Sequence, residues 1–367
     1  MKNIAVVFGG KSAEHDISVI TGVLTVNSLD AKCFCVIPIY VDRQGVWWTG
    51  KGLNKLSTYK NFSPKGKVGV TLIAGKQELF CIKGKKIKSL KLLDCIINCC
   101  HGLNGEDGSI SGLVKLCDIP ICSPDSFCSS FAIDKARTKI VLKGLGVPTL
   151  EYKVCYRDKF ESMPKEQVES ICKMPFPLIV KPANLGSSIG IESANTSEEL
   201  AVALKKAFVY DDKVIIEPKL VDFTEINCAC YKTDEIVVSE CEKPISSADI
   251  LTFADKYSGK GKREFPAIIA QSISKKIKFY TKKIYSELGF DGIIRIDYMV
   301  VGDKIYLNEI NTIPGSLAYY LFSPTISGYS KILSRLIETA IEKQQSINKN
   351  RYKFTSSILL QTGNLKK

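Results

Sequence analysis

Two β-rich segments flank Gly302 and predict a β-hairpin whose polar residues constrain the rest of the fold. The first segment carries Arg295 and Asp297, and the second carries Glu309 and Asn311. Residues two apart on a strand share a face, so the members of each pair project from the same side of their strand. The alignment of the two strands then decides whether the two pairs meet.

Only one of two loop lengths brings the carboxylates of this hairpin together. A two-residue loop places Asp297 opposite Asn308, whereas a three-residue loop through Lys304 places it opposite Glu309. We expect the three-residue loop, because it gathers two carboxylates, an amide oxygen and a guanidinium on one patch. Hard oxygen ligands of this kind suit Mg²⁺ that carries nucleotide phosphates. On these residues alone, the alternative is a surface hairpin crossed by salt bridges.

The composition is that of a folded chain with more than one domain. A length of 367 residues predicts two or three domains, and 45% hydrophobic with 24% charged residues is ordinary for a globular protein. No apolar segment approaches a membrane span, and the N-terminus is too short and strand-like for a signal peptide. The 14 cysteines form no CxxC pair and there are only 2 histidines, so we expect reduced thiols in a cytoplasmic protein rather than a zinc site.

The net charge of +13 raises the question of a nucleic-acid partner. Most of this charge lies in residues 51–91, which hold 11 lysines, no arginine and the single acid Glu78, a balance of 11 − 1 = +10. Arginine, which grips phosphates through two parallel hydrogen bonds, is absent there. We therefore expect a strand-and-loop insertion with a solvated lysine face, and no nucleic-acid or membrane partner. A non-enzymatic nucleic-acid-binding module remains an alternative that rests on charge alone.

Strand and helix signals divide the chain into three regions of α/β and α+β character. Residues 1–123 alternate strand and helix patterns and predict an N-terminal α/β domain with an open parallel sheet. Residues 124–217 form a central region of strand–helix–strand pattern. Residues 218–343 form a third region that contains the hairpin, and the tail, residues 344–367, has no assignment.

Three loops add chemical content to this outline. The segment 9–12, Gly-Gly-Lys-Ser, is not a phosphate loop because Ala5 stands where that motif needs glycine, but it still makes a ligand-facing crevice at a sheet edge. A second strand delivers Lys181 and is followed by the glycine–serine loop 184–190, whose backbone N–H groups can turn toward an anion. A third strand carries Glu217, which could meet a purine or simply precede an interdomain hinge.

In chain order, these residues resemble the D-alanine–D-alanine ligase family of ATP-grasp enzymes over about residues 3–340. The motifs that carry the resemblance are Gly9-Gly10-Lys11-Ser12-Ala13-Glu14, His101-Gly102, Gly105-Glu106-Asp107-Gly108, Asp134-Lys135, Ile179-Val180-Lys181-Pro182, Gly186-Ser187-Ser188-Ile189-Gly190, Lys256-Tyr257, Arg295-Ile296-Asp297, and Asn308-Glu309-Ile310-Asn311-Thr312 with Pro314-Gly315. The resemblance implies a three-domain ATP-grasp architecture, in which the second and third regions are the two ATP-grasp subdomains.

The resemblance further implies a two-step ligation for peptidoglycan synthesis, with ATP and Mg²⁺ (or Mn²⁺) as cofactors. One D-alanine carboxylate attacks the γ-phosphate of ATP, and the amine of a second D-alanine then displaces phosphate from the acyl phosphate. Such catalysis depends on positioning and charge neutralisation. The implied nucleotide and metal positions are phosphate contacts at Lys135, Lys181 and Lys256, adenine contacts at Glu217 and the Leu220 backbone, a ribose contact at Glu225, and metal ligands at Asp297, Glu309 and Asn311.

The remaining implied positions concern the amino-acid substrates. Arg295 and the Gly315 amide stabilise the oxyanion of the tetrahedral intermediate in this scheme. Glu14 anchors the ammonium of the first substrate and is linked through Ser187 to Tyr257 on a closing loop. A further active-site position falls on His101, for which a structural histidine at a strand end is the alternative.

The chain departs from the family at the second-substrate pocket. The family places a serine followed by leucine after the Pro-Gly pair, where this chain has Tyr320 and Leu321, and Leu251 replaces an aromatic residue of the mobile loop. A tyrosine hydroxyl can still donate to a carboxylate, but its ring takes far more volume. We therefore also consider a paralogous ligase that uses a different amino or hydroxy acid. Small-molecule amino-acid substrates and a homodimer complete the expectation.

Overall fold

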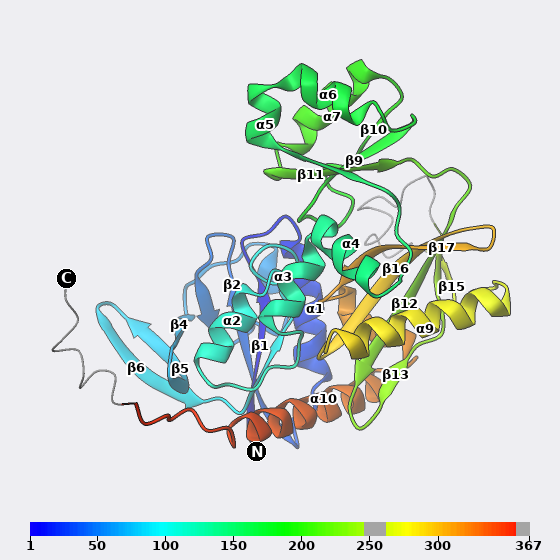
Figure 1. The fold of residues 1–367 in the computed structure, drawn as a ribbon. Helices are drawn as coiled ribbons and strands as arrows, with labels where there is room; N and C mark the ends of the chain where they lie inside the picture. The colour runs from blue at the N-terminus through cyan, green and yellow to red at the C-terminus, as the bar shows by residue number, and fades with distance from the viewer. Residues whose placement is uncertain (246–261, 357–367) are drawn as a thin grey trace.

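The computed structural model describes residues 1–245 and 262–356. These residues form an N-terminal, a central and a C-terminal body (Figure 1). The N-terminal body is built on a seven-stranded sheet, and the central and C-terminal bodies on four-stranded sheets. In Figure 1 the central body lies above the other two, and the long helix α10 (Ile326–Ile347) runs beneath them. Within the described residues, no helix combines the length and apolarity that crossing a bilayer requires.

The N-terminal sheet is mixed, which corrects the expected open parallel sheet. Its strand order is β6-β5-β4-β3-β2-β1-β7, and only β2, β1 and β7 run parallel to one another. The elements of this body are β1 (Lys2–Gly9), α1 (His15–Ser28), β2 (Phe34–Val41), β3 (Trp47–Thr49), η1 (Leu56–Tyr59), β4 (Val68–Ile73), β5 (Lys76–Lys83), β6 (Lys86–Leu92), β7 (Cys95–Asn98) and α2 (Ser109–Leu116). The antiparallel strands arise because consecutive strands from β2 to β6 are joined without crossover helices.

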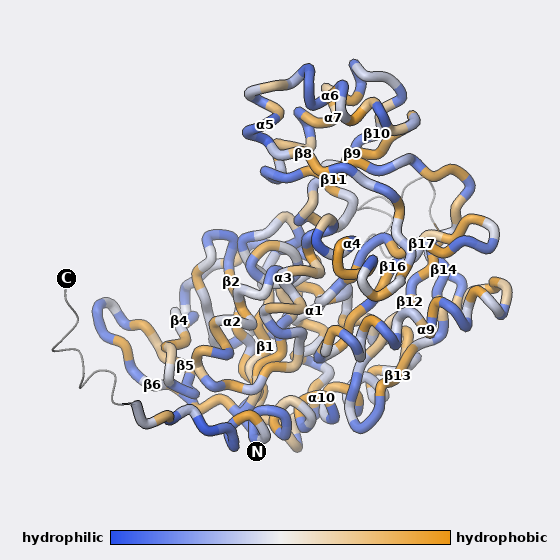
Figure 2. Tube along the Cα trace, in the orientation of Figure 1, coloured by the Kyte–Doolittle hydropathy of each residue, from blue (hydrophilic) through white to orange (hydrophobic). Residues whose placement is uncertain are grey.

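The lysine-rich segment 51–91 is a strand-and-loop insertion with a solvated face, as expected. It supplies η1, β4, β5 and most of β6, and every residue of β6 is exposed. Lysines on an edge strand oppose pairing with another sheet. In contrast, the apolar residues of β1 lie at the centre of this body (Figure 2), where five consecutive side chains from Ile4 to Phe8 are fully buried.

The central body is an antiparallel sheet of order β10-β9-β11-β8, with helices packed on one face (Figure 1). Its elements are β8 (Lys153–Tyr156), α5 (Arg157–Ser162), α6 (Pro164–Ile171), β9 (Leu178–Pro182), β10 (Glu192–Ala194), α7 (Ser197–Ala207) and β11 (Lys213–Pro218). Strand β9 carries Lys181 and the neighbouring β11 carries Glu217. The uncovered face therefore presents these two residues toward the rest of the molecule.

The C-terminal body has strand order β13-β12-β16-β17. Its elements are β12 (Thr224–Lys232), β13 (Ile236–Val238), the pair β14 (Lys243–Ile245) and β15 (Lys262–Glu264), α9 (Gln271–Glu287), β16 (Ile293–Val301), β17 (Lys304–Asn311), the short helix η2 (Gly315–Leu321) and α10. Helices α3 (Ser126–Ile133) and α4 (Lys135–Gly144) contact β17, and residues of both lie in the core of this sheet. Helix α10 and η2 share a core with α1 of the N-terminal body.

Candidate active site

Two adjoining cavities bring most of the predicted site residues together. The larger, about 630 Å³, lies between the central and C-terminal sheets, and the smaller, about 250 Å³, lies next to the N-terminal body. The predicted residues on the larger cavity are Lys135, Lys181, Glu217, Leu220, Glu225 and Glu309. The predicted residues on the smaller one are Glu14, His101, Ser187, Glu225, Arg295, Glu309, Asn311, Gly315 and Tyr320. The cavities share Glu225 and Glu309, so they form one continuous site.

Four predicted residues do not line these cavities or cannot be placed. Asp297 is fully buried beneath the cavity wall, and the Leu321 side chain is 3% exposed and packs in the apolar core shared with α1. A substrate contact by the Leu321 side chain is therefore not supported by its position. Lys256 and Tyr257, together with the divergent Leu251, lie outside the described residues.

The hairpin has the predicted alignment but reaches it by a different route. Asp297 lies opposite Glu309 and Arg295 opposite Asn311, as expected. The predicted three-residue loop is wrong, because Lys304 pairs with Val301 and leaves a two-residue turn. A β-bulge next to Asp297 absorbs one residue of β17 and restores the alignment.

A guanidinium and an amide hold Asp297 in place at the centre of this patch. Arg295 donates to both oxygens of the Asp297 carboxylate, from Nε at 2.7 Å and from Nη2 at 2.8 Å. The Asn311 amide nitrogen donates to Asp297 Oδ2 at 3.0 Å, which points the Asn311 amide oxygen elsewhere. Burial alone would lower the pKa of Arg295, but Asp297 outweighs burial and raises that pKa well above its usual value. Arg295 is therefore a permanent cation.

The donor set of the hairpin suits a hard divalent cation. Among the described residues, no group of three or more His, Cys, Asp or Glu side chains converges in the way a protein-only metal cage requires. The candidate ligands are instead the Glu309 carboxylate, the Asn311 amide oxygen and the remaining lone pairs of Asp297. Oxygen donors in this small number are typical of Mg²⁺ sites, which fill the other positions with water and phosphate oxygens.

Two largely buried lysines hold Glu217 on the wall of the larger cavity, and sequence reasoning missed one of them, Lys139. Glu217 accepts from Lys139 Nζ at 2.6 Å and from Lys181 Nζ at 2.7 Å, and all three side chains are largely buried. Lys181 Nζ also donates to Asn308 Oδ1 at 3.2 Å. Burial alone would raise the pKa of Glu217, but the two lysines outweigh it and hold the pKa at about 2. Lys139 could have been found from its spacing, because it lies four residues after Lys135 and so on the same helix face.

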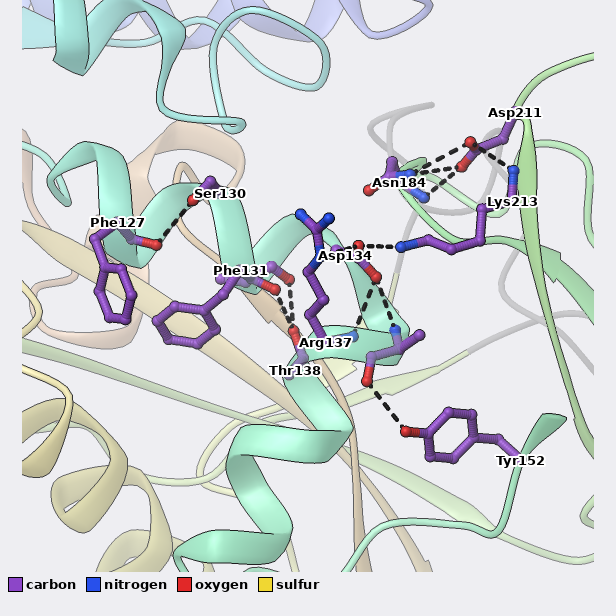
Figure 3. Close-up of polar contacts among 12 residues, drawn as sticks. Phe127, Ser130, Phe131, Asp134, Arg137, Thr138, Tyr152, Asn184, Asp211 and Lys213 are labelled. Atoms are coloured by element: carbon purple, nitrogen blue, oxygen red, sulfur yellow. Dashed lines mark hydrogen bonds and ion pairs between the residues drawn. The ribbon is translucent and has the colours of Figure 1, made fainter. Parts of the chain in front are cut away.

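Asp134 and Lys213 fix the start of α4 (Figure 3), the end of the helix that carries Lys135. Asp134 caps the helix by accepting from the backbone N–H groups of Ala136 and Arg137, and Lys213 of β11 pairs with the same carboxylate. This tie between the two bodies places Lys135, whose Nζ donates to the Leu185 carbonyl at 2.7 Å and lies 3.6 Å from Glu309 Oε2. Lys135 therefore bridges the glycine–serine loop and the candidate metal ligands.

Glu14 lies at the other end of the site in a cradle built from glycine and serine. The Glu14 carboxylate of the N-terminal body accepts a hydrogen bond from the Ser187 hydroxyl of the central body. Gly102 has φ +68°, and a Cβ at that position would lie 2.8 Å from Glu14 Oε2. Only glycine can bring its backbone so close in this conformation. The predicted link between Glu14 and Ser187 is present.

His101 is a neutral residue that organises the floor of the smaller cavity. Its Nε2 lies 3.0 Å from the Thr21 hydroxyl, which also accepts from the Ser316 backbone N–H at 3.0 Å. Burial, with a smaller contribution from Arg295, lowers the pKa of His101 to about 3. The imidazole therefore carries no charge at neutral pH, which favours positioning of η2 over proton transfer.

Glu106 is a second site residue whose part sequence reasoning did not identify. Its Oε2 accepts from the Gly102 backbone N–H at 2.9 Å, and its Oε1 accepts from the Ile313 N–H at 3.0 Å. Burial and the neighbouring Glu14 raise the pKa of Glu106 to about 8. Its motif was visible in the sequence, but its proximity to Glu14 follows only from the fold.

Tyr320 belongs to an unusual turn beside Arg295. Three consecutive non-glycine residues of η2, Ser316, Leu317 and Ala318, have φ between 47° and 53° and so adopt left-handed conformations. This turn brings the half-buried Tyr320 ring onto the wall of the smaller cavity. Burial raises the pKa of the Tyr320 hydroxyl, so it remains protonated at neutral pH.

Comparison with known proteins defines the class and then the family. The model of the D-ala D-ala ligase N-terminus matches residues 3–124, and that of the D-ala D-ala ligase C-terminus matches residues 141–342. With the fold and the lysine–carboxylate cleft described above, these matches define an ATP-dependent ligase of the ATP-grasp type. The chain belongs to the D-alanine–D-alanine ligase family.

Individual relatives agree with this placement along nearly the whole chain. The D-alanine–D-alanine ligase of Thermosipho melanesiensis is 36% identical over 354 residues, which is 94% of each chain. D-alanine–D-alanine ligase A of Escherichia coli K12 is 32% identical over 94% of this chain and 97% of its own. Among solved structures, the D-alanine–D-alanine ligase of Helicobacter pylori has a TM-score of 0.77 at 28% identity and covers 92% of this chain and 98% of its own. The VanG D-Ala:D-Ser ligase of Enterococcus faecalis has the same TM-score and identity and covers 94% and 99%.

Proposed function

We propose that this protein joins two D-alanine molecules with ATP, through an acyl-phosphate intermediate, for peptidoglycan synthesis. Family membership supports the reaction class, and one observation carries the assignment of the site. The lysine-lined cavity and the smaller, carboxylate-rich cavity share Glu225 and Glu309. A transferred phosphate at that junction lies within reach of an amino acid in the smaller cavity.

In the first step, the carboxylate of one D-alanine attacks the γ-phosphorus, and ADP leaves as the acyl phosphate forms. Lys135 and Lys181 offset the negative charge that builds up on the phosphate oxygens, because each ammonium is fixed before the substrate arrives. Glu217 holds Lys181, and the predicted adenine contacts at Glu217 and Leu220 and the ribose contact at Glu225 belong to the same proposal. A divalent cation held by Asp297, Glu309 and Asn311 would neutralise phosphate charge when bound.

In the second step, the amine of the other D-alanine attacks the acyl carbonyl, phosphate leaves, and the nitrogen loses a proton. Arg295 is a permanent cation that lines the smaller cavity, and in this proposal it stabilises the oxyanion together with the Gly315 amide. Glu14 accepts the ammonium of the first D-alanine. Water must be excluded while the acyl phosphate exists, and the predicted contributions of Lys256 and Tyr257 to closure lie outside the described residues.

A second candidate function is ligation of D-alanine to a different amino or hydroxy acid. It is favoured by the Tyr320 ring, which occupies the wall where the family has serine, and by the equal structural likeness to a D-Ala:D-Ser ligase. A homodimer and a cytoplasmic location remain predictions, and light scattering of the purified protein tests the first.

ADP formation with each D- and L-amino acid, combined with mass measurement of the products, tests the proposal. Stimulation by D-alanine alone, with a product of the mass of D-alanyl-D-alanine, supports it. Turnover that requires D-alanine together with another acid establishes the second candidate. Absence of stimulated ADP formation with every amino acid would refute both, and salt-sensitive DNA binding in that case would favour the nucleic-acid module.

A further inference from the structure

Arg263 is a charged residue of the smaller cavity that the mechanism above leaves without a task. It lies on β15, where it pairs with Pro244 of β14. Its guanidinium carbon lies 4.3 Å from the centre of the Tyr320 ring, which is close enough for a cation–π interaction. Its Nη1 lies 3.7 Å from Glu242 Oε1, and its side chain is 47% exposed.

The charges of the cavity explain why Arg263 matters for an amino-acid substrate. Among the described residues that line it, five are acids: Glu14, Glu106, Glu225, Glu242 and Glu309, of which Glu106, with its pKa raised to about 8, is protonated at neutral pH. The described arginines on this wall are Arg263 and Arg295, and no described lysine lines it. A wall with this excess of acid repels a substrate carboxylate unless a cation receives it.

Arg295 already has a task in the proposed mechanism, the stabilisation of the oxyanion. Two of its nitrogens already donate to Asp297 at hydrogen-bond distance. The described contacts of Arg263 are different, because its ion pair with Glu242 is longer than a hydrogen bond and its other contact is the face of a ring. A stacked guanidinium keeps its N–H donors in its own plane, where a carboxylate can accept two of them side by side.

The reaction indicates which of the two substrate carboxylates Arg263 receives. The carboxylate of the donor amino acid is consumed by phosphorylation, whereas that of the acceptor persists unreacted through both steps. The acceptor must therefore be held by a charge that takes no part in the chemistry.

We propose that Arg263 binds the carboxylate of the acceptor amino acid, with the Tyr320 ring as its platform and Glu242 as its counterion, an inference that rests on the proposed ligase function. Glu242 is suited to hold Arg263, because it is itself fixed. The Glu242 side chain is 5% exposed and accepts from Asn227 Nδ2 at 3.2 Å, and the backbones of Glu242 and Asn227 are hydrogen-bonded to each other in both directions.

The test is a competition between two acceptors in one tube. D-alaninamide has no carboxylate, so it can serve as acceptor but not as donor. With D-alanine and D-alaninamide both present, the ratio of D-alanyl-D-alanine to D-alanyl-D-alaninamide measures the preference for an acceptor carboxylate. The ratio is independent of the amount of active enzyme, so partial loss of folded protein does not affect it.

We expect Arg263→Gln to shift this ratio toward the amide by at least about tenfold, since a hydrogen-bonded charge pair is lost. Arg263→Lys keeps the charge and should restore much of the preference. The matched control is Arg335→Gln, which removes an arginine that forms ion pairs with Asp234 and Glu338 outside both cavities, and should leave the ratio unchanged. The KM for ATP should be the same in all of these variants.

The outcomes separate this inference from the function on which it rests. An unchanged product ratio in Arg263→Gln, with both products formed, would overturn the role of Arg263 and leave the ligase function in place. In that case the Glu242–Arg263 pair only braces β14 against β15. Failure of the wild type to form either product would overturn the ligase function and this inference together.

Discussion

At the scale of single residues, Asp297 and Glu309 lie opposite each other but differ in their surroundings. Asp297 is completely buried and accepts two hydrogen bonds from Arg295, whereas the Glu309 side chain is 16% exposed. Loss of the Asp297 charge therefore leaves the Arg295 guanidinium without its counterion, whereas loss of the Glu309 charge does not. The two carboxylates have to be tested differently, although both are candidate metal ligands.

We expect Glu309→Gln to raise the Mg²⁺ concentration for half-maximal ADP formation at least about tenfold, because a charged ligand is replaced by a neutral one. Its free energy of unfolding should change by less than about 1 kcal/mol. Asp297→Asn should lose activity and also about 3–5 kcal/mol of stability, the cost of an unpaired buried charge. Mg²⁺ titrations and urea unfolding of both variants check this, and an unaltered Mg²⁺ requirement in Glu309→Gln would contradict the metal assignment.

Tyr320 contributes a ring and a hydroxyl to the smaller cavity, the proposed acceptor pocket, and the effects of the two groups can be measured separately. Tyr320→Phe keeps the ring beneath Arg263 and should leave acceptor selectivity within about twofold, because the cation–π contact survives. Tyr320→Ser removes the ring and should change selectivity among acceptors by roughly 10–200-fold at similar ATP affinity. Product ratios with paired acceptors measure both variants. If Tyr320→Ser leaves them unaltered, Tyr320 contributes only packing.

At the scale of elements, local patterns predicted the strands and helices better than the way in which they join. The motif residues of β9, β11 and the hairpin were found because each lies on a short segment of clear pattern. The bulge beside Asp297 was missed, because a single extra residue leaves no signal in the alternation of side chains. Arg263 and Glu242 were missed for another reason. Their proposed role in substrate binding depends on the contact of Arg263 with Tyr320, which is more than 50 residues away in sequence.

The left-handed turn of η2 is an element whose strain can be measured. Ser316 has φ 53°, a conformation that costs a residue with a side chain about 1–2 kcal/mol and glycine much less. We expect Ser316→Gly to raise the free energy of unfolding by up to about 1 kcal/mol after the greater freedom of glycine in the unfolded chain is counted. The Ser316 N–H that donates to Thr21 is retained.

The matched control for this turn is Ser330→Gly inside α10, which should lower the free energy of unfolding by about 0.5 kcal/mol. Urea unfolding of both variants gives the comparison. If Ser316→Gly destabilises the protein as much as Ser330→Gly does, the turn is not strained.

At the scale of the whole molecule, the candidate active site forms where three bodies meet, and this assembly brings a group of acids out of water together. Glu14 comes from the start of α1, Glu106 from the loop before α2, and Glu309 from β17. Separate segments of the sequence predicted Glu14 and Glu309 through their motifs. The mutual effect of these acids could not be predicted, because it depends on distances that only the assembled fold sets.

This assembly makes stability depend on pH in a defined window. The pKa of Glu106 rises from 4.5 to about 8 on folding, so between these values the folded protein holds a proton that the unfolded chain has released. The stabilisation is complete below pH 4.5 and is lost as the pH rises through about 8. The free energy of unfolding should therefore fall by up to about 1.4 kcal/mol per pH unit through this window. His101 has the opposite tendency, but it acts only below its unfolded pKa of 6.5.

Urea unfolding of the wild type and of Glu106→Gln between pH 6.5 and 8.5 isolates the contribution of Glu106 as the difference between the two proteins, because the histidines and the buried cysteines contribute alike to both. Glu106→Gln has no proton to release, so its free energy of unfolding should fall less steeply with pH than that of the wild type. Glu14→Gln keeps Glu106 but removes the neighbouring charge that raises its pKa, so the decline in stability should move to lower pH. Equal slopes in Glu106→Gln and in the wild type would place the titrating group elsewhere. A window that stays fixed in Glu14→Gln would show that burial alone, and not the meeting of α1 with the loop before α2, sets the pKa of Glu106.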